Sequence, residues 1–118
     1  LAVYLTEDSI KAWQTDSKGP TLTPPTGTDN PNYWHRHIVR TALNGNQDAW
    51  GDPLKGTGTV TYNVDNIVMK QYTYTIPDKF NNVDCNPDHC YVIAFVYDDD
   101  PASPTYKEIL QVEEKKVK

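Results

Sequence analysis

Turn-forming residues break this chain into short extended segments. Stretches that alternate apolar and polar residues, such as 56–64 and 67–77, are separated by clusters of Gly, Pro, Asn and Asp. Strict alternation puts the apolar side chains on one face of a β-strand, and no segment shows a helical period of useful length. Short strands at this spacing predict an all-β fold, an antiparallel β-sandwich of about seven strands.

Three segments give more detailed expectations. The turn signal at 65–66 predicts that 56–64 and 67–77 form a β-hairpin. CYVIAFVYD at 90–98 is apolar on both faces, which is typical of a central strand covered on both sides. The stretch 17–32 is rich in Pro, Gly, Thr and Asn, so we expect a long loop there, the most mobile part of the chain.

Length and charge limit the classes of function. The 118 residues are enough for a single domain, 1–118. The net charge is −5, and the only basic cluster is the final KKVK, so we expect no nucleic-acid partner. No apolar run approaches the ~20 residues of a membrane helix. The chain begins inside a strand-like pattern, so we expect it to be part of a longer exported protein.

The chain has two cysteines, Cys85 and Cys90, in the segment CNPDHC. Asn-Pro between them favours a turn that brings the two thiols together, and a disulfide is the first interpretation. Two free thiols in a reducing compartment, or a metal knuckle that includes His89, are the alternatives. A disulfide would imply an exported protein.

YWHRHIVRTALNG at 33–45 contains His35 and His37, which would share a face of one strand. Two ligands are too few for a tight zinc site, and His89 would complete it only if the 85–90 turn lay nearby. We therefore expect no metal there and a structural strand instead. Arg36 and Arg40 would lie on the opposite, partly solvated face.

Other candidates for binding lie between strands. The carboxylates of Asp98, Asp99 and Asp100 follow the apolar strand and could serve calcium, although Asp also simply forms turns. Trp50 lies between turn signals, where an exposed aromatic side chain would be a binding feature. Neither a Gly-x-Ser-x-Gly motif nor a glycine-rich phosphate loop is present, so we expect no enzyme activity and no cofactor.

Several segments, in this order, resemble one family. VYLTEDSI, YWHRHIVRTALNG, WGDPL, VIAFVYD and ILQVEEKKV are similar to the C-terminal domain of the 28-kilodalton outer membrane protein family of Bacteroidetes. The resemblance covers residues 3–117. It implies an immunoglobulin-like sandwich that follows a thioredoxin-like domain in an exported or lipid-anchored surface protein, with no catalytic residues to transfer.

The resemblance and the residues together lead to one functional expectation. We expect a non-catalytic accessory or adhesion module at the cell envelope, with a protein or glycan partner at the cell surface and membrane attachment only through an anchor outside this chain. The alternatives are a carbohydrate- or calcium-binding module attached to another domain, and a docking domain for a thioredoxin-like partner domain.

Overall fold

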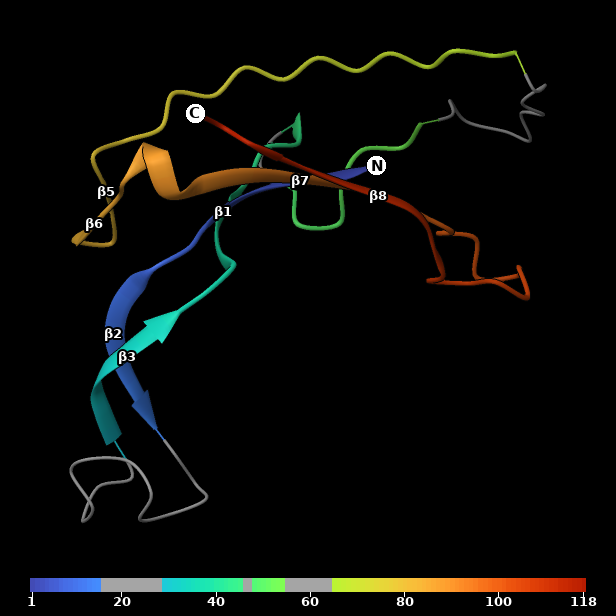
Figure 1. Ribbon diagram of the computed structural model, residues 1–118. Helices are drawn as coiled ribbons and strands as arrows, with labels where there is room; N and C mark the ends of the chain where they lie inside the picture. The colour runs from blue at the N-terminus through green and yellow to red at the C-terminus, as the bar shows by residue number, and fades with distance from the viewer. Residues whose placement is uncertain (16–28, 46–47, 55–64) are drawn as a thin grey trace.

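The computed structural model describes residues 1–15, 29–45, 48–54 and 65–118, and these residues form an all-β structure (Figure 1). A short 3-10 turn, η2 (Pro87–His89), is the helical element named among them. The all-β, antiparallel fold expected from the sequence is confirmed, in an arrangement consistent with a β-sandwich. The strands are β1 (Ala2–Glu7), β2 (Ile10–Thr15), β3 (Asp29–His35), β4 (Ile38–Ala42), β5 (Lys79–Phe80), β6 (Val83–Asp84), β7 (Cys90–Tyr97) and β8 (Ile109–Lys116).

The main sheet has four antiparallel strands in the order β4-β1-β7-β8. Strand β7 pairs with β1 on one side and with β8 on the other, so 90–98 is an interior strand, as predicted. The expectation that it is covered on both faces is wrong, because seven of its eight residues are only half-buried. β1 is the covered strand instead: Leu5 and Thr6, which point to opposite faces, are 1% and 2% exposed.

The loop after β4 explains the burial of β1. Asn44 is buried, and its side-chain oxygen accepts a hydrogen bond from the backbone N–H of Val3 at 2.7 Å. The backbone N–H of Leu43 donates to the carbonyl of Val3, and that of Asp52 donates to the carbonyl of Leu1. The segments 43–45 and 48–52 therefore lie along β1, held by hydrogen bonds that no apolar pattern predicts. The buried apolar core of the described residues consists of Ala2, Val3, Leu5, Ala42 and Cys90.

Strands β2 and β3 form a two-stranded arm that leaves the main sheet (Figure 1). The backbone turns at Ser9 (φ 61°) and at His37 (φ 50°), both in the left-handed region. Asp8 holds the corner, because its carboxylate accepts a hydrogen bond from the backbone N–H of His37 at 2.5 Å. The prediction of one continuous strand through 33–43 is therefore wrong, and β3 and β4 belong to different sheets.

A hairpin does form, but at a different place from the predicted one. β5 and β6 are joined by Asn81 and Asn82, whose φ values of 48° and 66° suit the tight turn of a two-residue hairpin. Residues 66–77 form no strand, because alternation alone does not supply the neighbour that strand backbone groups need. Their predicted partner, 56–64, lies outside the described residues.

The predicted loop at 17–32 is also revised. Residues 29–32 belong to β3, where they pair with the end of β2. Residues 16–28 lie outside the described part of the chain, so the mobility expected of this loop stays a prediction.

Candidate functional site

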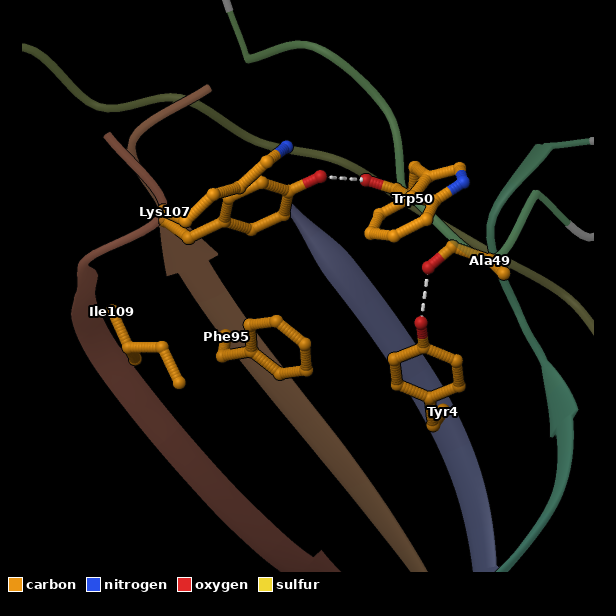
Figure 2. Close-up of a pocket in the computed structure, with 7 residues that line it drawn as sticks. Tyr4, Ala49, Trp50, Phe95, Lys107 and Ile109 are labelled. Carbon is orange, nitrogen blue, oxygen red and sulfur yellow. Dashed lines mark hydrogen bonds between the residues drawn. The ribbon is translucent and has the colours of Figure 1, made fainter. Parts of the chain in front are cut away.

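The loop that contains Trp50 is held against the end of the main sheet by two tyrosine hydroxyls (Figure 2). Tyr4 on β1 donates a hydrogen bond to the carbonyl of Ala49, and Tyr97 on β7 donates to the carbonyl of Trp50. Asp48 accepts a hydrogen bond from the backbone N–H of Trp50 at 2.8 Å. The backbone at Trp50 is thus fixed, while its side chain is 72% exposed. The exposed position expected for this tryptophan is confirmed.

An aromatic hollow lies beneath this loop. Figure 2 shows Tyr4, Phe95 and Ile109 on the neighbouring strands β1, β7 and β8, with Trp50 and Lys107 beyond the strand ends. The hollow has a volume of about 200 Å³ and is lined by Tyr4, Ala49, Trp50, Phe95, Tyr97, Lys107 and Ile109.

Lys107 lies among aromatic rings at the edge of this hollow. Its Nζ is 5.3 Å from the ring centre of Trp50, 5.0 Å from that of Tyr97 and 4.8 Å from that of Tyr106. These distances are within the range of cation–π attraction. Nζ also donates a hydrogen bond to the carboxylate of Asp99 at 2.6 Å, and this bond raises the pKa of the Lys107 ammonium.

A larger, acidic hollow adjoins the aromatic one and shares Trp50 and Tyr97 with it. Its volume of about 750 Å³ is within the usual range of ligand pockets. The structure brings together the binding candidates that the sequence indicated, because all four of them line this hollow. The acidic lining consists of Asp48, Asp52, Asp98, Asp99 and Asp100.

The aspartates after β7 shape the loop from within. Asp98 accepts hydrogen bonds from the backbone N–H of Asp100 at 3.0 Å and from the hydroxyl of Thr105 at 2.7 Å. Asp100 accepts one from the backbone N–H of Ala102 at 2.9 Å. A carboxylate has about four lone-pair positions, so each of these groups can still accept a hydrogen bond from a ligand.

Asp52 connects this site to the segment 66–77. Its carboxylate accepts hydrogen bonds from the Tyr72 hydroxyl at 2.8 Å and from the backbone N–H of Gly45 at 3.2 Å. These bonds, that from Tyr72 first, lower the pKa of Asp52, so the carboxylate stays charged in mildly acidic solution. Asp52 therefore supplies one negative charge to the acidic hollow.

A second cluster lies at the opposite end of β1. The Sγ atoms of Cys85 and Cys90 are 3.6 Å apart, as free thiols, so the predicted disulfide stays a prediction. Glu7 lies beside them and accepts a hydrogen bond from Arg40 Nε at 2.7 Å and another from the backbone N–H of Asn86 at 2.8 Å. The side chain of Arg40 is 7% exposed, so the expected partly solvated position is wrong for Arg40. Arg36 is exposed, in line with that expectation.

The cluster brings together three donor groups that a metal ion could use, one of which, the Glu7 carboxylate, is already paired with Arg40. In the described ranges, the group of three metal-ligating side chains whose donor atoms lie within 4.8 Å of one another is Glu7, Cys85 and Cys90. Burial first, then the hydrogen bond with Cys90, raises the pKa of the Cys85 thiol to about 12. The positive charge of Arg40, which is paired with Glu7, would oppose a cation bound at this cluster. Sequence reasoning missed Glu7 and assigned Arg40 to a partly solvated face, because no local pattern shows that these two residues pair.

The histidines do not form the shared face that His-x-His spacing suggested. His35 ends β3, whereas His37 lies in the corner before β4. The two ring nitrogens of His37 are each 3.4 Å from a carboxylate oxygen, Nδ1 from Asp8 and Nε2 from Glu114. His37 is thus a link between the corner and β8.

A family model described as outer membrane protein Omp28 matches residues 1–118, the full length of the chain. The chain belongs to the Omp28 family. An outer membrane protein is a protein of the cell envelope, so the cell-envelope assignment expected from the sequence is supported at that level. Neither the curated proteins nor the solved structures contain a match for this Omp28 family member. Within the described residues, no helix is long and apolar enough to cross a membrane.

Proposed function

We propose that the chain is a non-catalytic adhesion or interaction module of a bacterial cell-envelope protein, and that its surface partner contacts the end of the sheet around Trp50. The observation that supports this proposal is an exposed indole ring on a backbone fixed by hydrogen bonds from Tyr97 and to Asp48. An aromatic side chain presented in this way costs little conformational entropy on binding, because its backbone is already ordered.

The chemistry of the two hollows favours a neutral glycan. The ring of Trp50 offers an apolar surface for the C–H face of a sugar, and the aspartates of the acidic hollow offer acceptors for its hydroxyl groups. Acidic polymers are disfavoured, because five carboxylates line the larger hollow. A protein partner with a basic or hydroxyl-rich surface is the second outcome that the test below distinguishes.

Two alternatives have less support. Calcium binding would draw on Asp98, Asp99 and Asp100, but Asp99 pairs with the ammonium group of Lys107, a positive charge that opposes a cation at this loop. Among the described residues, none gives particular support to the docking of a thioredoxin-like domain. The Bacteroidetes origin, the C-terminal position in a longer exported lipoprotein and the anchor outside this chain belong to the same proposal as the adhesion role.

The test is glycan-array binding by the wild-type chain and by Trp50→Ala, with and without calcium. Trp34→Ala is the matched control, because Trp34 is also exposed, at 58%, but lies on the β2–β3 arm. We expect neutral glycans to bind the wild type and Trp34→Ala, with or without calcium, and to lose at least tenfold in affinity for Trp50→Ala.

Two outcomes would contradict the glycan assignment. Calcium-dependent binding would favour the calcium alternative, and equal losses for Trp50→Ala and Trp34→Ala would remove the site from this end of the sheet. If no glycan bound, and cross-linking through position 50 captured a defined surface protein, the partner would be a protein and the adhesion role would stand.

A further inference from the structure

The strand β8 (Ile109–Lys116) is an exposed edge of the main sheet. It pairs with β7 on one side, and among the described residues the strand order β4-β1-β7-β8 gives it no neighbour on the other. All eight of its residues are exposed, including Ile109, Leu110 and Val112 at 56–59%. β4, at the other edge, is shorter and includes buried Ala42 and nearly buried Arg40. β8 therefore offers a full row of backbone donors and acceptors to an added strand.

The charges on β8 restrict which strand can be added. Residues 113–116 read Glu-Glu-Lys-Lys, in a strand with no Pro or Gly. Charged side chains normally protect an edge against indiscriminate pairing. A strand that runs antiparallel and carries the same order of charges along its own direction escapes that protection, because opposite charges then face each other.

We propose that β8 pairs antiparallel with β8 of a second copy of this chain, so that two four-stranded sheets join into one. A two-fold axis normal to the sheet keeps each face of the joined sheet continuous. Because side chains alternate between the two faces along a strand, two paired residues must both have odd numbers or both have even numbers. With the axis at Glu114, Glu113 of each copy faces Lys115 of the other. Glu114 meets its own equivalent at the axis, but Lys116 of the opposite strand is its diagonal neighbour on the same face.

The joined sheet would also bring Val112 and Val117 against side chains of the second copy. The same register places Gln111 opposite Val117, and Val112 opposite the alkyl stem of Lys116 of the second copy. The two copies of Trp50 would then lie toward opposite ends of the joined sheet, since the β8 strands run antiparallel. This proposal does not depend on the nature of the ligand at Trp50.

Analytical ultracentrifugation of charge variants tests the register. We expect the wild type to show a monomer–dimer equilibrium that weakens with salt. Glu113→Lys and Lys115→Glu should each weaken dimerisation by about tenfold or more, because each change turns two attractive pairs into two repulsive ones. The double variant Glu113→Lys/Lys115→Glu should recover dimerisation, and Lys11→Glu on β2 is the matched control that should behave as wild type.

A measurement on the wild type covers the case in which the variants fail to fold. Amide hydrogens of 109–116 should exchange more slowly at high protein concentration than at low concentration. A wild type that stays monomeric at its highest soluble concentration would overturn the proposal. So would a dimer that leaves the exchange of these amides unchanged, or a double variant that dimerises no better than the single variants.

Discussion

At the scale of single residues, the buried ion pair between Glu7 and Arg40 is the main stabilising contact that the sequence did not predict. The two side chains are 4% and 7% exposed. Arg40 also donates a hydrogen bond to the carbonyl of Asp84 at 2.8 Å, so it joins β1, β4 and the segment before η2. A charged side chain without a partner would not be stable at such burial, and each residue is therefore required by the other.

We predict that Arg40→Ala destabilises the fold by about 3–5 kcal/mol, because it leaves the buried carboxylate of Glu7 uncompensated. The exposed ion pair of Lys79 and Asp84 is the control, with side chains that are 61% and 85% exposed. Lys79→Ala should cost at most about 1 kcal/mol. Urea unfolding of both variants measures the difference. Equal losses would show that Arg40 is solvated in solution.

We predict that Cys85 and Cys90 form a disulfide in the exported protein, as their spacing and their 3.6 Å separation suggest. Thiol titration of the unfolded, unreduced protein should then find no reactive group. Two reactive thiols would show that the pair remains reduced.

In the reduced protein, the raised pKa of Cys85 has a definite consequence for stability. Its folded pKa of about 12 lies above the ordinary thiol pKa of 9.0, so the folded state holds the proton more tightly than the unfolded state does. Stability from this group is present below pH ~9 and is lost as the pH rises toward ~12. Denaturation of the reduced chain across this range should show the loss, and Cys85→Ala should reduce it.

At the scale of elements, apolar content and burial diverge. CYVIAFVYD is the most apolar stretch, yet β1 is the strand whose two faces are covered, because the segments 43–45 and 48–52 hydrogen-bond along it. The corner between β3 and β4 was likewise not predicted from the sequence. Neither Arg36 nor His37 is a usual turn former, and the left-handed φ of His37 depends on its hydrogen bond to Asp8.

We predict that Leu5→Ala costs more than Phe95→Ala. Leu5 is 1% exposed, so its truncation should cost about 2–5 kcal/mol. Phe95 is half-buried, at the wall of the aromatic hollow, so its loss should fall below the ~3–5 kcal/mol usual for a fully buried Phe. Chemical denaturation of the two variants checks the order. The reverse order would mean that β7, not β1, is the covered strand.

At the scale of the whole molecule, the structure is extended rather than spherical. Its radius of gyration is 18.5 Å, whereas a compact domain of this length would have about 13.5 Å. The β2–β3 arm contributes to this shape by leaving the main sheet (Figure 1). The exposed strand β8 is an edge of the main sheet, and the exposed Trp50 lies in a loop at the end of that sheet. A bound partner or a second copy would add apolar contacts at these two places, which the small core does not supply.

The sequence by itself determined the all-β class, the interior position of 90–98 and the candidates Trp50, Asp98, Asp99 and Asp100. These predictions rest on alternation and turn chemistry, which are local properties of the chain. Only the tertiary structure decided that those four residues line one hollow, that Glu7 pairs with Arg40 and that β1 is the covered strand. Such contacts join residues 33 to 51 positions apart, and no local pattern encodes which distant backbone or side-chain group will be the partner.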